Sequence, residues 1–138
     1  WECAMGEHAS VAELIRSAYA ARHRGDLDEL MGYFHEQCSY RLAGGPTASD
    51  VFVQPQGHAA VRAQMAALIA TYVFSNIEEL ALMVDGDRAA LHWRADVRCL
   101  PSGRSGSFEI IDLFTFADGK LTSVTQFTDT AGVARLSA

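Results

Sequence analysis

Hydrophobic and polar positions alternate with two different periods along the chain, one in each half. In the first half, apolar side chains recur every three or four residues, the spacing of a helix face. This spacing predicts helices from Ala9 to about Arg24, from Asp26 over the next two turns, and over 58–73. In the second half the period is two, which is typical of half-buried strands. We therefore expect strands at 77–84, 88–100, 107–116 and 121–128, and a shorter one at 38–42.

Turn residues separate these segments. Asp85-Gly86 and Asp118-Gly119 are dipeptides that favour tight hairpins between two strands. Arg24-Gly25 places a basic residue and a glycine where the first helix should end. Asp26, followed three residues later by Glu29, resembles a capping box and predicts the start of the second helix.

Two segments lack a clear period. Residues 1–8 predict a loose N-terminal lead-in, and 9–138 predict a single domain. Residues 43–57 contain several Gly and Pro residues and predict a long loop, with a short strand at 51–53. A loop of this length is either a lid or binding segment or a plain surface insertion.

The order of elements predicts an α+β fold, in which three N-terminal helices pack on one face of a mixed, mostly antiparallel sheet. If that sheet is strongly curved, it forms a cone around the helices. Such a cone would leave an internal apolar pocket between the two layers, where a small molecule could bind.

Composition narrows the classes of function. The formal charge of −6 argues against nucleic acid, because a phosphate binder needs a basic patch. No apolar run approaches the ~20 residues of a membrane span. Cys3, Cys38 and Cys99 cannot all pair internally, which fits free thiols in a reducing, cytoplasmic setting. We find no metal-ligand spacing and no fingerprint of a nucleotide cofactor, so we expect neither.

Asp112 is the strongest candidate for chemistry. By period two it shares a strand face with four apolar side chains, Phe108, Ile110, Phe114 and Phe116. Burial among such side chains raises the pKa of a carboxyl group, so that it can accept or hold a proton near neutral pH. A purely structural ion pair with Arg94 or Arg98 on the preceding strand is the alternative.

The long strand at 88–100 carries a polar file and an apolar file. The polar file is His92, Arg94, Asp96 and Arg98, and the apolar file is Leu91, Trp93, Ala95, Val97 and Cys99. Alternation by itself predicts that the polar file faces solvent.

Several local motifs occur together in this order. They are Arg24-Gly25-Asp26, then Gly57-His58-Ala59-Ala60-Val61, then Asp112-Leu113-Phe114 followed by Asp118-Gly119-Lys120-Leu121. With the order of elements, they make nearly the whole chain resemble the nuclear transport factor 2-like fold, also called cystatin-like or SnoaL-like. That superfamily includes ketosteroid isomerase, polyketide cyclases, limonene epoxide hydrolase and non-enzymes, so the fold does not imply one function.

The resemblance implies different residues for different activities. In SnoaL-type cyclases the proposed base is an Asp in an Asp-aliphatic-Phe motif, which Asp112 matches, although the partnering His is missing. In limonene epoxide hydrolase an Arg-x-Asp pair points into the pocket, which implies that Arg94 and Asp96 do so here. Its second essential Asp falls at Gln126, and of its Tyr-x-Asn only Tyr40 is kept. The base Asp of ketosteroid isomerase falls near Leu42.

Three hypotheses follow. The first is a cofactor-independent isomerase, cyclase or lyase that moves a proton on an apolar, oxygen-bearing molecule. The second is epoxide hydrolysis by a water activated at Asp96 and braced by Arg94. The third is a non-catalytic module for ligand binding or dimerisation, and the fold implies a homodimer formed through the outer sheet face. The residues expected to act in catalysis are Asp112, Asp96 and Arg94, and those expected to bind substrate are Tyr40, His92, Trp93, Phe114 and Gln126.

Overall fold

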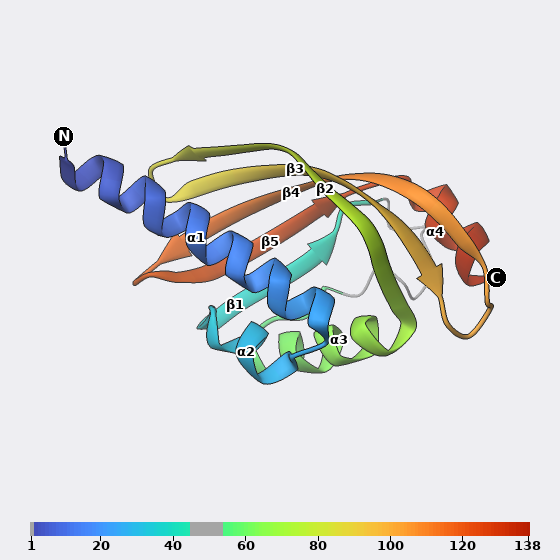
Figure 1. Ribbon diagram of the computed structural model, residues 1–138. Helices are drawn as coiled ribbons and strands as arrows, with labels where there is room; N and C mark the ends of the chain where they lie inside the picture. Colours follow the sequence, from blue (N-terminus) through green and yellow to red (C-terminus); the bar gives the residue numbers. More distant parts are fainter. Residues whose placement is uncertain (1, 45–53) are drawn as a thin grey trace.

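The computed structural model describes residues 2–44 and 54–138, with side chains described from residue 11 onwards (Figure 1). In chain order the elements are α1 (Glu2–Arg24), α2 (Leu27–Gly32), β1 (Phe34–Leu42), α3 (His58–Thr71), β2 (Tyr72–Asp85), β3 (Arg88–Cys99), β4 (Ser105–Ala117), β5 (Lys120–Phe127) and α4 (Thr130–Ser137).

One curved, unclosed sheet forms the body of the protein. Its strand order is β1-β5-β4-β3-β2, with β1 parallel to β5 and all other neighbours antiparallel. In Figure 1, α1 crosses in front of the sheet, α2 and α3 lie below it, and α4 lies beside the C-terminus at the far end. The predicted α+β fold, with its helices gathered on a curved mixed sheet, is therefore confirmed.

The inner face of the sheet is the hydrophobic core. Along β3 and β4 every second side chain is buried, as the period-two pattern predicted. On β4 the buried file is the predicted one, with Asp112 between Ile110 and Phe114. Among the described residues, no helix is both long and apolar enough to cross a membrane.

The helix cap and the tight turns predicted from the sequence are present in the structure. The Asp26 side chain accepts a hydrogen bond from the Glu29 backbone N–H at 3.1 Å and so caps α2. Gly86 and Gly119 have φ angles of 61° and 72°, the left-handed conformation that tight hairpin turns require.

Some boundaries differ from the prediction. Helix α1 begins at Glu2, not near Ala9. Strand β1 begins at Phe34, earlier than the predicted 38–42, and β2 begins at Tyr72, inside the segment 58–73 that was predicted as helix. The strand expected at 51–53 lies outside the described residues.

Helix α4 was missed, since only strand was expected after residue 77. The Asp129 side chain accepts a hydrogen bond from the Gly132 backbone N–H at 2.9 Å, so it caps the helix. The last turn is held by Ser102 Oγ, which donates to the Leu136 carbonyl at 2.6 Å. Eight residues are too few to show a helical period clearly, and Asp129 was the one available signal.

We expect Asp129→Ala to lower the free energy of unfolding by about 1 kcal/mol, because the first turn of α4 loses its capping acceptor. Urea denaturation measures this. Asp87→Ala, which removes a carboxylate from an exposed hairpin turn, is the control and should change stability much less. Equal losses in the two variants would contradict a capping role.

Candidate active site

A cavity of about 140 Å³ lies between the helices and the inner face of the sheet. Most of its wall is apolar, and α4 contributes Val133 and Leu136 at one end. The polar or ionisable side chains on the wall are Tyr19, Arg22, His23, Tyr40, Gln64, Tyr72, Trp93, Gln126 and Thr128. The predicted internal pocket is thus present, with a few polar groups in an apolar surround, the usual composition of a small-molecule site.

Asp112 lies directly behind this wall. It is fully buried, and two residues that line the cavity donate hydrogen bonds to its Oδ2 atom. These donors are Trp93 Nε1, at 2.9 Å, and the Tyr19 hydroxyl. The other carboxyl oxygen, Oδ1, has no hydrogen-bond partner among the described residues. The carboxyl group is therefore held through one oxygen and left unsatisfied at the other.

Burial raises the pKa of Asp112 from 3.8 to about 6, while hydrogen bonds from Tyr19 and Trp93 and a smaller contribution from Gln126 oppose the rise. The pKa of Tyr19 is raised well above its ordinary value, first by burial and then by the neighbouring Asp112 charge. Near neutral pH the Tyr19 phenol therefore keeps its proton, and the Asp112 carboxyl group is the member of the pair that can gain or lose one.

A second tyrosine completes the polar cluster. The Tyr40 hydroxyl donates to Gln126 Oε1 at 3.2 Å, and Gln126 is the cross-strand neighbour of Asp112 on β4. Burial, with a smaller contribution from the Asp112 charge, raises the pKa of Tyr40. Two neutral phenols and a carboxyl group thus converge from α1, β1 and β4. Leu42, where the base of ketosteroid isomerase would fall, adds only an apolar surface.

Among the predicted substrate-binding residues, Tyr40, Trp93, Phe114 and Gln126 line the cavity. Tyr19, which also lines the cavity, was not among the predicted site residues. The available signal was its place on the buried helix face, because a buried phenol usually needs a hydrogen-bond partner. The sequence could not show that this partner is Asp112, which lies 93 residues further along the chain.

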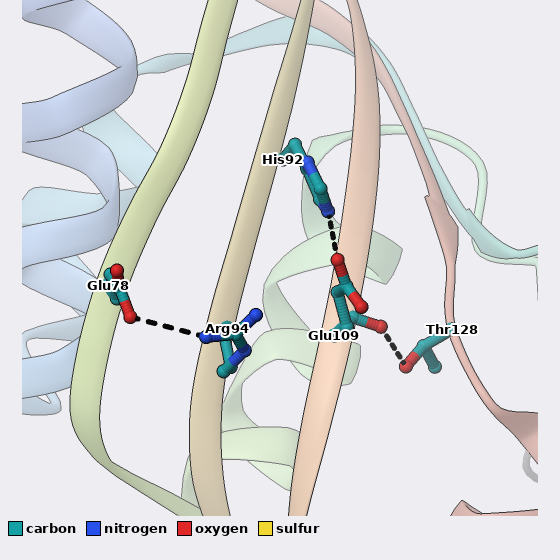
Figure 2. Close-up of polar contacts among 5 residues, drawn as sticks. All are labelled: Glu78, His92, Arg94, Glu109 and Thr128. Atoms are coloured by element: carbon teal, nitrogen blue, oxygen red, sulfur yellow. Dashed lines mark hydrogen bonds and ion pairs between the residues drawn. The ribbon is translucent and has the colours of Figure 1, made fainter.

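His92 and Arg94 do not line the cavity. They lie on the outer face of the sheet, where His92 Nε2 is 2.6 Å from Glu109 Oε1 and Arg94 Nη1 donates to Glu78 Oε2 at 3.5 Å. Figure 2 shows these side chains on the face turned away from the helices. Their predicted roles at the cavity are therefore corrected: β3 turns its apolar file inward because that file buries more apolar surface.

Asp96 belongs to the same outer file. Its carboxylate accepts hydrogen bonds from Asn76 Nδ2 at 2.7 Å and Ser107 Oγ at 2.6 Å, and these bonds lower its pKa. A carboxylate held ionised on the outer face cannot activate a water inside the cavity. The Arg94–Asp96 arrangement implied by limonene epoxide hydrolase is thus absent from the cavity.

Among the described residues, no group of three or more His, Cys, Asp or Glu side chains is placed to hold a metal ion.

Comparison with protein families and solved structures gives a consistent result. A family model described as a SnoaL-like domain matches residues 15–124. No curated protein matches the chain significantly. A structure of an NTF2-like protein from Burkholderia xenovorans LB400 shares 22% identity and a TM-score of 0.80, covering 94% of this chain and 97% of that one.

Two other neighbours carry the names of enzymes. A candidate polyketide cyclase from Xanthomonas campestris pv. campestris shares 19% identity and a TM-score of 0.76, over 94% of this chain and 98% of that one. An LEH-like epoxide hydrolase from M. tuberculosis shares 14% identity and a TM-score of 0.73, over 93% and 92%. At these identities the likeness establishes the fold, while activity has to be argued from the site.

We expect Asp112→Asn to be more stable than the wild type near neutral pH, with the difference disappearing towards about pH 4. The folded protein retains a proton on Asp112 that the unfolded chain releases, since the folded pKa of about 6 exceeds 3.8. The contribution of this group to stability is therefore present at low pH and lost as pH rises through about 6, by about 3 kcal/mol. Asparagine cannot ionise and escapes that loss.

Urea denaturation of both proteins at several pH values measures the difference. Burial, together with the Arg22 charge, lowers the pKa of His23 to about 4, which gives a pH dependence of opposite sign over the same range. Because His23 is present in both proteins, its effect cancels in the difference. A difference that does not change with pH would show that Asp112 is not a strained buried acid.

Proposed function

Because the chain belongs to the SnoaL-like domain family, we propose that it binds an apolar, oxygen-bearing small molecule in its cavity and moves a proton on it by general acid–base chemistry. The reaction class is that of an isomerase, cyclase or lyase that needs no cofactor for the proton transfer. The observation that carries the proposal is the fully buried Asp112 carboxyl group, hydrogen-bonded to a phenol on the cavity wall.

Asp112 does not line the cavity itself, so its proton passes through Tyr19. With Asp112 ionised, the Tyr19 oxygen takes a proton from the bound molecule while the Tyr19 hydroxyl proton moves to Asp112. One bond from the ligand to hydrogen breaks, and one oxygen–hydrogen bond forms on the carboxyl group. The reverse transfer returns the proton to another position of the ligand. A folded pKa of about 6 suits Asp112 to both directions near neutral pH.

The same cluster can stabilise negative charge that develops on a ligand oxygen. A protonated carboxyl group beside a tyrosine in an apolar site forms the oxyanion hole of ketosteroid isomerase. Tyr40, whose pKa is raised by burial, has a second hydroxyl on the same wall, which would donate to the ligand in place of Gln126. Donors that are already ordered and shielded from water contribute more to transition-state stabilisation than donors in solvent.

The fold of the named neighbours supports this class of reaction, since a candidate polyketide cyclase uses a scaffold of the same shape. Epoxide hydrolysis by Asp96 and Arg94 is not proposed, because both side chains lie on the outer face. Among the described residues the Oδ1 atom of Asp112 has no hydrogen-bond partner, and a buried acceptor of this kind costs free energy in a folded protein.

A general test uses benzisoxazole, a small bicyclic molecule whose ring opens when a carbon-bound proton is removed and whose phenolate product absorbs light. We expect the wild type to accelerate this opening, with a rate that rises with pH and levels off above about 6 as Asp112 ionises. Asp112→Asn should lower the rate about a hundredfold or more. Tyr19→Phe should do the same, because the relay is broken at its first atom.

The matched control is Asp96→Asn, which removes a carboxylate from the opposite face of the same sheet and should leave the rate unchanged. A wild-type rate no higher than that of acetate buffer at equal pH would contradict the proposal. A loss of rate in Asp96→Asn equal to that in Asp112→Asn would also contradict it, and would return catalysis to the outer face.

The homodimer stays a prediction, for which we propose an interface on the outer face of the sheet. On the outer face Ile111, Leu113 and Phe127 are 41%, 44% and 42% exposed, and Ile111 pairs directly with Phe127 across β4 and β5. We expect Leu113→Lys to convert a dimer into a monomer in sedimentation velocity, since it buries a charge in that interface. Leu100→Lys, at a residue 48% exposed just beyond β3, is the control. A monomeric wild type would refute the prediction.

A further inference from the structure

The cavity wall carries two more ionisable side chains, which the proposed proton transfer does not use although one of them adjoins Tyr19, with ring centres 6.0 Å apart. They lie at the last turn of α1, where Arg22 and His23 line the wall beside Phe74 of β2. Arg22 lies with its guanidinium carbon 4.7 Å from the centre of the Phe74 ring. His23 packs with its ring centre 5.5 Å from that of Phe74 and 5.8 Å from that of Trp93.

Arg22 is a cation inside the wall without an acidic partner. Its Nη2 atom donates to the backbone carbonyls of Leu68 and Tyr72, both at 3.3 Å, and no other hydrogen bond or ion pair to its guanidinium is found among the described residues. Burial lowers its pKa to about 10, so it still carries its charge at neutral pH. The long bonds and the Phe74 ring compensate only part of the cost of burying a charge.

His23 is even less satisfied. Both of its ring nitrogens are buried, and neither has a hydrogen-bond partner among the described residues. Burial and the adjacent Arg22 keep this ring neutral near pH 7, so it offers one N–H donor and one acceptor. Each buried polar atom without a partner costs free energy, which a bound polar group would relieve.

We propose that Arg22 and His23 bind an anionic oxygen group of the ligand, so that the molecule taken up by this cavity is an aromatic or otherwise apolar carboxylic acid. A carboxylate accepts hydrogen bonds from both side chains and supplies the charge that Arg22 lacks. The inference deepens the proposed function, and rests on it only in taking the cavity as the substrate site.

The two groups of polar side chains lie close enough together to contact one ligand. The charge of Arg22 reaches both Tyr19 and Tyr40, whose pKa values it lowers against the effect of burial. A cavity of about 140 Å³ is close in size to an engineered one that holds a benzene ring. His23 and Tyr19 are neighbours, with ring centres 6.0 Å apart, so the ligand would present its carboxylate to Arg22 and His23 and lay its ring-sized body along the apolar wall beside Tyr19.

A structural role explains only part of this arrangement. The two carbonyls that Arg22 contacts belong to the end of α3 and the residue after it, so the guanidinium also caps that helix. Capping uses one nitrogen of Arg22 and none of His23. The test must therefore separate ligand charge from protein stability.

The test compares benzoate with benzamide, two probes of nearly equal shape that differ in charge. Isothermal titration calorimetry on the full chain measures both dissociation constants. We expect the wild type to bind benzoate about tenfold or more tightly than benzamide, as charge-assisted hydrogen bonds predict. Equal affinities would overturn the proposal. The ratio of the two affinities reports on charge alone, because a change in folding or cavity volume affects both probes alike.

Variants assign the preference to its residues. Arg22→Met should abolish it, Arg22→Lys should retain part of it, and His23→Leu should reduce benzoate binding severalfold while stability stays equal or rises. The matched control is Arg24→Met, which removes a cation of the same helix that is exposed and paired with Glu29, and should leave the ratio unchanged. A ratio that survives Arg22→Met, or falls equally in Arg24→Met, would overturn the assignment.

Failure here and failure of the proton-transfer function give different results. If benzoate and benzamide bind equally while benzisoxazole is still opened through Asp112, the anion site is wrong and the catalytic cluster stands. If the benzoate preference depends on Arg22 while Asp112→Asn leaves the rate unchanged, the protein is a carboxylate-binding module without this chemistry.

Discussion

The burial of one carboxyl group at the inner face of the sheet is the constraint on which the interior depends. A shift in the pKa of Asp112 from 3.8 to about 6 corresponds to about 3 kcal/mol that the folded protein gives up when the group ionises. That loss is tolerable because Tyr19 and Trp93 donate to one oxygen. Both donors must be held in place, so the register of β3 on β4 and the position of α1 over the sheet become parts of the site.

Charged side chains have different surroundings on the two faces of the sheet. On the outer face, Arg94, His92 and Asp96 each have a partner close by, and solvent screens them, so each pair contributes little. On the inner face, ionisable groups are few and incompletely partnered. Charged side chains on the outer face are therefore solvated and paired, while those in the interior are desolvated. We expect chemistry at the desolvated groups.

Desolvation of this kind is common where function competes with stability. Among the described residues, the Asp112 Oδ1 atom behind the cavity wall and the two ring nitrogens of His23 on it have no hydrogen-bond partner, and Arg22 on the same wall pairs with no acidic side chain. A core selected only for stability would replace them with apolar side chains of similar volume. Because these groups lie close together and the rest of the wall is mostly apolar, they suit a ligand that carries polar groups on an apolar body.

The alternation of apolar and polar residues and the two Asp-Gly turns in the sequence determined the main strands, both Asp-Gly hairpins and the burial of Asp112. They could do so because the period of two is a local property of extended backbone. The motifs and order of elements likewise indicated the SnoaL-like fold. Helix α4 was not predicted, because the only signal for it was the capping residue Asp129, and the short segment that follows shows no clear helical period. Only the tertiary structure decided which file of β3 faces inward, because that choice depends on the area buried against helices distant in the chain. It alone brought Tyr19 to Asp112, and Arg22 and His23 to the same cavity, since no local pattern encodes contacts between residues far apart in sequence.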